Sequence, residues 1–272
     1  MKGSFVSFWK KSKAAAKLAI LSHLEYRFNF FIDAYMQPMI TTLVEMALWY
    51  GIWVQGGFQS LNGFGLNSYL AYALWATFVA RITVNWEYEM RMMEDIETGK
   101  LNAILLRPFS FYSFYLSQFF GYKFSVILGT LGVPLIATYL LDLPLHYERL
   151  PVVFVLILIY VLFAHTLSFF FSCFGFFMTR AHSLTIAKNV ALWVLAGEVF
   201  PLDLVPEPYG KWMMWSPFAS GVYVPVGFLT GRFGYEEFFE ALLSLVVSLS
   251  IVGVAAVGIW RAGITRYVGT GA

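Results

Sequence analysis

The chain has 272 residues, of which 59% are hydrophobic, 19% aromatic and only 12% charged, and its formal net charge is +2. A soluble domain carries about 25% charged residues, so this composition excludes a disordered chain and predicts an integral membrane protein. The balanced charge gives no sign of a nucleic-acid partner. The single cysteine, Cys173, excludes an internal disulfide and a cysteine-based metal site.

Residues 1–30 predict an N-terminal helix that lies in the membrane interface. A basic start precedes AAAKLAIL, but this apolar run is short, contains Lys17 and has no small-residue cleavage site after it, which argues against a signal peptide. Helical spacing groups Lys10, Lys13 and Lys17 on one side, where they would meet anionic lipid headgroups. The apolar side comprises Phe5, Trp9, Ala16 and Ile20. The alternative is a basic tail that only sets the topology.

Six apolar stretches approach the roughly 20 residues needed to cross a bilayer. The predicted spans are Phe31–Val54, Leu66–Asn85, Phe124–Leu141, Val152–Phe177, Leu184–Leu202 and Phe238–Ile259. These are continuous apolar runs without the alternation of a membrane barrel, so the predicted fold class is all-α, in a single domain. Most lysines and arginines fall on the side that carries both termini, which predicts that both termini are cytoplasmic.

The connection Glu87–Gln118 predicts a helix–turn–helix on the cytoplasmic surface. It carries an apolar stripe at helical spacing, is interrupted at Gly99 and stops at Pro108. The stripe comprises Met90, Met93, Ile96, Leu101, Ile104 and Leu105, and the nearby acids are Glu94, Asp95 and Glu97. An amphipathic helix of this kind suits docking to a soluble partner. A helix resting on lipid is the alternative, but anionic headgroups would repel its acids.

The connection Pro201–Gly234 predicts an external, partly re-entrant segment. It is too apolar for a solvated loop and too broken by proline for a complete span. The prolines are Pro201, Pro206, Pro208, Pro217 and Pro225. Helix fragments that dip into the outer leaflet satisfy both facts if their irregular backbone is buried in protein.

Three ionisable residues fall inside or near the predicted spans, where an unpaired charge is expensive. They are Glu45, Arg81 and Glu198. Arg81 has two candidate partners, Glu45 on the neighbouring span or water at the end of its own helix, and a packing role is favoured over contact with a substrate. Glu198 faces either the mouth of a pathway or the outer interface.

The chain shows no enzyme motif. The phosphate-binding pattern G-x-x-x-x-G-K-[ST] does not occur, nor does G-x-S-x-G, and the four histidines lack metal-ligand spacing. We therefore expect a non-catalytic chain without its own cofactor or metal.

Two motifs carry a family resemblance. The first is G-K-L-x-x-x-L-L-R-P, formed by Gly99, Lys100, Leu101, Leu105, Leu106, Arg107 and Pro108. The second is G-x-x-F-P-L-x-x-x-P, with Gly197, Phe200, Pro201, Leu202 and Pro206, followed by Ser216, Pro217 and Phe218. In this order the motifs resemble the permease subunits of type-2 ABC exporters, in a bacterial branch without an assigned substrate.

The resemblance implies a permease in the bacterial inner membrane that pairs with a second permease subunit, identical or different. A separate ATPase would bind ATP and Mg²⁺ and would dock at a coupling helix that maps onto Met90–Gly99. Within that helix, Met93 and Ile96 are expected to be the buried anchors of the contact and the acids its rim. The alternatives are a proton-coupled carrier, a membrane scaffold and a lipid-modifying membrane enzyme.

Overall fold

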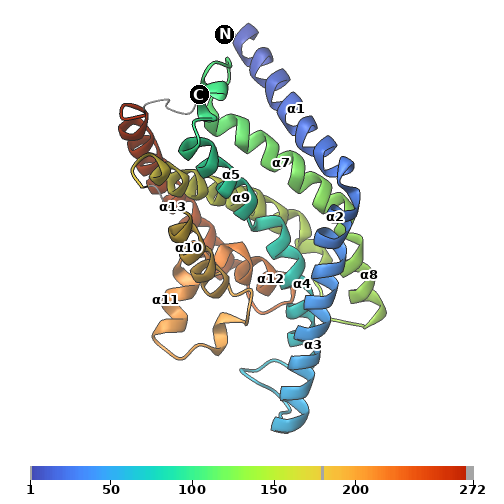
Figure 1. The fold of residues 1–272 in the computed structure, drawn as a ribbon. Helices are drawn as coiled ribbons and strands as arrows, with labels where there is room; N and C mark the ends of the chain where they lie inside the picture. Colours follow the sequence, from blue (N-terminus) through green and yellow to red (C-terminus); the bar gives the residue numbers. More distant parts are fainter. Residues whose placement is uncertain (1, 179–180, 268–272) are drawn as a thin grey trace.

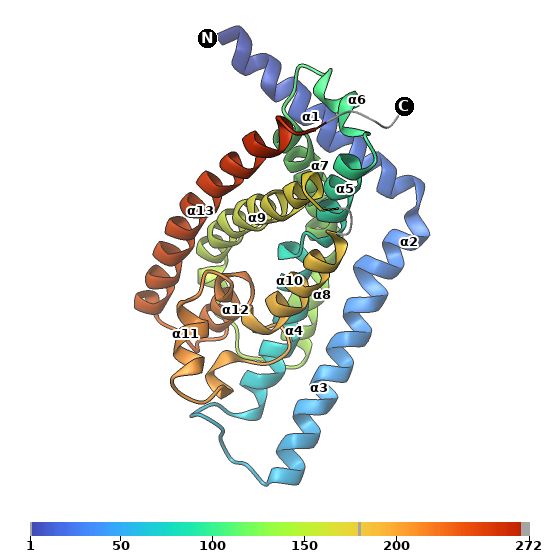
Figure 2. The same cartoon turned by 60° about the vertical axis from the view of Figure 1, so that its left-hand side comes forward.

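The computed structural model describes residues 2–178 and 181–267. Across these residues the fold is all-helical apart from one isolated bridge between Leu61 and Phe64. Figures 1 and 2 show an elongated helical bundle with the start of α1, α5, α6 and the last turns of α13 gathered at one end. The all-α prediction is confirmed.

The N-terminal third of the chain forms α1 (Lys2–Glu25), α2 (Arg27–Phe31), a π-helix at Ile32–Met36 and α3 (Gln37–Gly56). Helix α3 is followed by the cap residue Gly57, whose backbone φ of +62° favours glycine. Next come α4 (Leu66–Thr83), which is buried over most of its length, and α5 (Trp86–Glu97).

After α6 (Leu101–Leu105), the chain forms α7 (Phe111–Thr130) and α8 (Gly132–Leu140). A 3₁₀ turn at Tyr147–Arg149 then leads into α9 (Leu150–Ser172), followed by a second turn at Cys173–Phe176 and by α10 (His182–Leu195). Short helices follow at Leu202–Leu204, α11 (Tyr209–Trp215), Ala219–Gly221 and α12 (Tyr223–Leu229), before the long α13 (Tyr235–Ile264).

Three of the described helical stretches are long and apolar enough to cross a membrane. They are Phe111–Leu140, Tyr147–Phe176 and Tyr235–Ile264. Helices α3, α4 and α10 coincide with three further predicted spans, so the count of six stays a prediction.

The predicted start of the third span was wrong. That span was expected to begin at Phe124, but α7 begins at Phe111. Ser110 caps the helix, with its Oγ accepting a hydrogen bond from the Ser113 N–H at 3.2 Å, and the aromatic run that follows is apolar enough to continue into α7. The helix–turn–helix therefore ends at Leu105, and residues 111–118 of the connection form the first turns of α7.

Helix α1 runs along α7, as Figure 1 shows, and small side chains lie at the contact. Ala15 and Ala19 are buried, and a Cβ atom at Gly121 of α7 would lie 2.4 Å from the Ala16 carbonyl oxygen. Ala16 of the predicted apolar side thus lies at this contact, whereas Trp9 is exposed. Leu18, Leu21 and Leu24 remain exposed, and a position in the membrane interface stays a prediction.

The segment 201–234 is broken into short helices, as its prolines predict, and is partly enclosed by protein. All seven residues of α12 are buried against α4 and α9. At its end, the Arg149 Nη1 atom donates to the carbonyl oxygens of Phe228 at 2.7 Å and Phe233 at 2.9 Å. Side-chain donors and surrounding protein therefore satisfy part of the irregular backbone.

Candidate functional site

Helix α5 is embedded in the bundle by its apolar face. Met92 and Met93 are fully buried and Ile96 is 3% exposed, in contact with α9, the turn after α9, and α10. The expectation that Met93 and Ile96 anchor an ATPase was therefore wrong. Their stripe is already covered by the helices of this chain, which the sequence pattern of one amphipathic helix does not reveal.

A buried ion pair fastens the same face of α5 to the neighbouring helices. Glu89 is fully buried and Lys188 of α10 is 10% exposed, and the lysine ammonium donates to the Glu89 carboxylate. Ser168 of α9 donates to this carboxylate at 2.8 Å, and Ser172 donates to the Glu89 carbonyl at 3.1 Å. One carboxylate thus joins α5, α9 and α10.

The sequence analysis missed Glu89, although a signal was present. Glu89 precedes Met92, Met93 and Ile96 by three, four and seven residues, so helical geometry places it within the apolar stripe. An acid in such a stripe is almost never fully buried without a partner. The spacing alone could therefore have marked Glu89 as a paired residue, though not Lys188 as its partner.

The opposite face of α5 is polar and open. Glu94 is exposed and Met90 is half-buried, while the Glu97 side chain is 21% exposed, with a carboxylate oxygen 3.8 Å from the His182 Nδ1 atom. Lys100 donates to the Glu94 carboxylate at 2.6 Å, and this contact lowers the pKa of Glu94. Asp95 accepts a hydrogen bond from the Tyr115 hydroxyl at 2.6 Å, while burial raises the pKa of Asp95. This outer face is the part of the predicted coupling region that another chain can reach.

The turn after α5 presents the first motif at the same end of the molecule. Gly99 has a φ of +80°, which allows the chain to reverse into α6. Leu106 is 88% exposed and Arg107 is also exposed. The carbonyl oxygen of Pro108 accepts a hydrogen bond from the Lys11 ammonium at 2.7 Å, so α1 holds this loop.

The three ionisable residues of the predicted spans lie within electrostatic range of one another, as a loose cluster without a direct contact among them in the described residues. Glu45 accepts a hydrogen bond from the Thr77 hydroxyl at 3.2 Å, and the described residues contain no Arg81–Glu45 ion pair. Instead, Arg81 interacts electrostatically with Glu198, and Glu198 with Glu45. The cluster thus draws on α3, α4 and the segment after α10.

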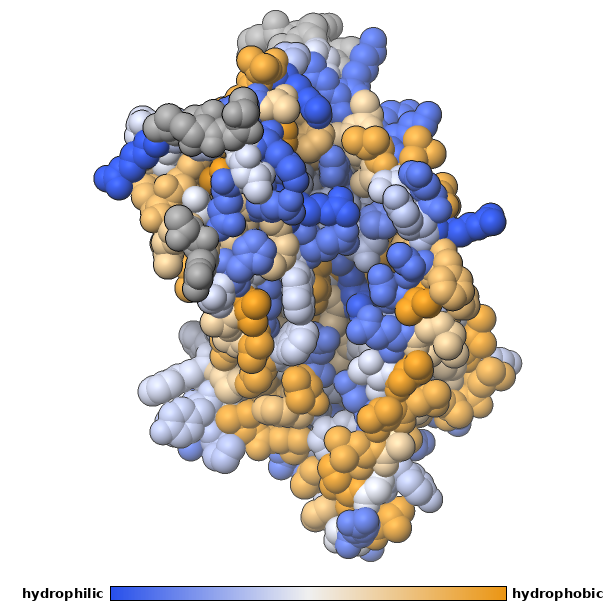
Figure 3. Space-filling view, viewed as in Figure 1, coloured by the Kyte–Doolittle hydropathy of each residue, from blue (hydrophilic) through white to orange (hydrophobic). Residues whose placement is uncertain are grey.

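Figure 3 shows hydrophilic residues along the middle of the face seen in Figure 1, with hydrophobic residues on both sides. A small cavity of about 40 Å³ between α4, α9 and α10 is lined in part by Asn85, Lys188, Asn189 and Glu198. The face shown in Figure 3 therefore carries polar side chains between apolar ones.

The second motif organises the opposite end of the bundle. Gly197 has a φ of +75°, and its carbonyl oxygen accepts a hydrogen bond from the Tyr72 hydroxyl at 2.5 Å. Phe200 packs against the Trp49–Tyr69 cluster. In this motif region, Pro201 is buried, Pro217 is half-buried and Pro206 is exposed.

A second buried ion pair, also missed from the sequence, braces this end. Arg232 donates to the Asp203 carboxylate at 2.8 Å, and its side chain is only 1% exposed. The guanidinium lies 4.4 Å and 4.3 Å from the ring centres of Phe64 and Tyr69. These contacts tie together three segments that lie far apart in the sequence.

Within the described ranges, no group of three histidine, cysteine, aspartate or glutamate side chains is arranged to hold a metal ion.

Residues 39–271 match the family of ABC-2 family transporter proteins. The chain belongs to this family. No curated protein matches the sequence. The matched region runs from α3 through α13 and includes both motifs and both buried ion pairs. The protein is therefore a membrane component of an ABC transporter.

Proposed function

We propose that this chain is the permease subunit of an ATP-driven exporter, coupled through the outer face of α5 to a separate ATPase. The observation that carries the proposal is the division of α5 into two faces. Its inner face is fixed to α9 and α10 by apolar packing and the Glu89–Lys188 pair, whereas its outer face is charged and open.

This arrangement suits the transmission of force. A partner that pushes on the outer face of α5 would also displace α10, because a buried ion pair resists separation of its two charges. Only two residues separate the end of α4 from the start of α5, so α4 would move with it. Both α4 and α10 border the cluster of Arg81, Glu45 and Glu198. Closure of an ATPase would thus move the helices that form the polar face of the bundle.

The polar face supports a role as one wall of a transport pathway. Ionisable side chains in a membrane span generally face a protein interior or a water-filled cavity rather than lipid. A second permease subunit, identical or different, placed against this face would cover Arg81, Glu45 and Glu198. The chemical class of the cargo is left unassigned.

In this proposal the chain performs no chemical step, and the ATPase binds ATP and Mg²⁺. The start of α1, α5, α6 and the last turns of α13 lie at one end of the bundle, consistent with an orientation that leaves both termini in the cytoplasm of a bacterial cell. The family match favours this function over a proton-coupled carrier or a membrane scaffold.

The outer face can be tested without disturbing the core. Glu94→Lys combined with Glu97→Lys reverses one exposed charge and one partly exposed charge beside His182. We expect the variant to fold but to lose copurification of its ATPase, or to retain an ATPase whose hydrolysis no longer drives transport. Glu236→Lys, at the start of α13 and at the opposite end of the bundle, is the matched control.

Normal ATPase binding and normal transport by the Glu94→Lys, Glu97→Lys variant would exclude the outer face of α5 as the coupling surface. Substitution of Met93 or Ile96 by aspartate cannot serve this purpose, because a charge at either buried site would unfold the permease itself.

A further inference from the structure

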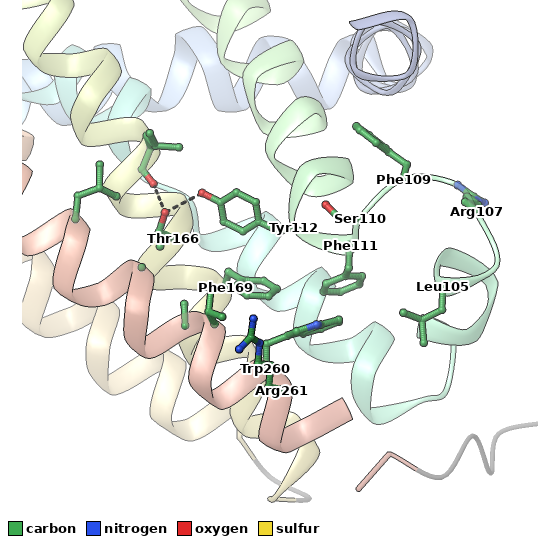
Figure 4. Close-up of a pocket in the computed structure, with 15 residues that line it drawn as sticks. Leu105, Arg107, Phe109, Ser110, Phe111, Tyr112, Thr166, Phe169, Trp260 and Arg261 are labelled. Carbon is green, nitrogen blue, oxygen red and sulfur yellow. Dashed lines mark hydrogen bonds between the residues drawn. The ribbon is translucent and has the colours of Figure 1, made fainter. Parts of the chain in front are cut away.

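A large cavity lies between the start of α7, α9 and the last turns of α13. Its volume is about 770 Å³, within the range of roughly 300–1,000 Å³ that is typical of ligand-binding cavities. Figure 4 shows its aromatic wall, in which Phe111 and Trp260 stack with ring centres 5.5 Å apart and Phe169 packs against Trp260. Leu249, Gly253 and Val257 line the cavity along one face of α13.

The inner wall of the cavity has little open hydrogen-bonding capacity. The Tyr112 hydroxyl and the Thr166 Oγ1 atom are hydrogen-bonded to each other at 2.9 Å, and Thr166 donates to the Leu162 carbonyl oxygen at 2.8 Å. Since Thr166 uses its hydrogen for Leu162, Tyr112 is the donor of the first bond. The deep part of the cavity is therefore suited to hydrocarbon rather than to a polar ligand.

The rim of the cavity carries two cations and no acid. Arg107 lines it from the loop before α7 and Arg261 from the last turn of α13, and both are exposed. No aspartate or glutamate lines the cavity, and neither arginine has an ion-pair partner among the described residues. A phosphate group is the complement of two guanidinium groups.

The depth of the cavity matches one leaflet of a bilayer. Arg107 precedes the candidate span Phe111–Leu140 by four residues, and Arg261 lies in the last turn of the candidate span Tyr235–Ile264, so both belong at one membrane border. Along α13 the lining runs from Arg261 back to Leu249, which is about 18 Å at 1.5 Å per residue. Half of the hydrocarbon core is about 15 Å thick.

We propose that this cavity binds one anionic phospholipid of the membrane. Arg107 and Arg261 hold the headgroup phosphate, and an acyl chain lies along the aromatic wall and the Leu249–Val257 face of α13. The inference requires only that the chain lies in a membrane, so it stands or falls independently of coupling to an ATPase.

Native mass spectrometry of the delipidated full-length protein tests the proposal, with dioleoyl phosphatidylglycerol and dioleoyl phosphatidylcholine as probes. The wild type should retain phosphatidylglycerol preferentially. A basic residue near anionic lipid contributes about fivefold in affinity, so Arg107→Gln with Arg261→Gln should weaken phosphatidylglycerol binding roughly 30-fold. Phosphatidylcholine binding should weaken less, because its choline cation already offsets the charge of its phosphate. Arg266→Gln, outside the lining, is the matched charge control.

A second variant tests the acyl-chain site while keeping both arginines. Gly253 has open space where a side chain would begin, so Gly253→Leu should fold and should narrow the cavity. We expect it to reduce binding of both lipids. Equal retention of the two lipids by the wild type, an unchanged preference in the double arginine variant, or full binding by Gly253→Leu would each overturn the proposal. A change in oligomeric mass on Gly253→Leu, without lipid binding by the wild type, would place a second copy of the chain in the cavity instead.

Discussion

The Glu89–Lys188 pair offers the sharpest test of how α5 is held. Lys188→Met removes the ammonium and leaves the Glu89 carboxylate fully buried, with a hydrogen bond from Ser168 at 2.8 Å as its remaining side-chain contact. Removing one partner of a buried ion pair costs about 3–5 kcal/mol, because the other charge stays in a low-dielectric site.

For a chain of this size, about 1 kcal/mol corresponds to roughly 2–4 °C in the midpoint of thermal unfolding, so Lys188→Met should lower the midpoint by about 6–20 °C. The double variant Glu89→Gln, Lys188→Met should recover part of this loss, since it leaves no buried charge. Thermal unfolding of the purified protein in one detergent gives all values needed for a double-mutant cycle.

Glu94→Gln is the matched control on the same helix. It breaks the ion pair with Lys100, but both side chains are more than half exposed, so solvent screening should leave the midpoint almost unchanged. Two results would show that the buried pair does not hold α5 against α10. One is a thermal midpoint of Lys188→Met equal to that of Glu94→Gln. The other is a midpoint loss in the double variant equal to the sum of the losses in its single variants. The proposed path from α5 to the polar face would lose its support.

Three further predictions concern α1, the far end of the bundle and the topology. Gly121→Leu should push α1 off α7 and speed proteolysis of α1, whereas Gly132→Leu, which meets open space, should not. Equal rates of α1 proteolysis in the two variants would contradict the close crossing of α1 and α7. Arg232→Gln should destabilise the fold by about 3–5 kcal/mol, because its guanidinium is buried in an ion pair; an unchanged thermal midpoint would refute this. Lys211→Cys with Cys173→Ser should react with an impermeant thiol reagent applied outside the cell, and labelling from the cytoplasmic side alone would reverse the proposed orientation.

Local sequence features determined the class of this protein. The shortage of charged residues and the length of the apolar runs indicated a helical membrane protein, and the proline-broken segment 201–234 does form short helices. These inferences succeeded because the hydrophobicity of a segment and the conformational limits of proline act within a few turns of the chain. The two motifs indicated the ABC-2 family, which the match over residues 39–271 confirms.

The partners of buried groups were decided by tertiary structure. The helical periodicity of the sequence identified the apolar stripe of α5, but it cannot identify the surface that covers this stripe. In the structure, Met93 and Ile96 are buried against helices of the same chain. The single ionisable residues of the spans were visible in the sequence, but the order of the spans alone could not decide between Glu45 and water as the partner of Arg81.

The partners in the two buried ion pairs were likewise decided by tertiary structure. Glu89 and Lys188 are separated by 99 residues and Asp203 and Arg232 by 29, and neither pair has a helical spacing that connects its members. Long-range electrostatic contacts depend on which helices cross and at what depth, and those crossings are set by the packing of all the helices together. The sequence therefore determined which segments are apolar helices, whereas only the packed bundle decided which of their charges meet.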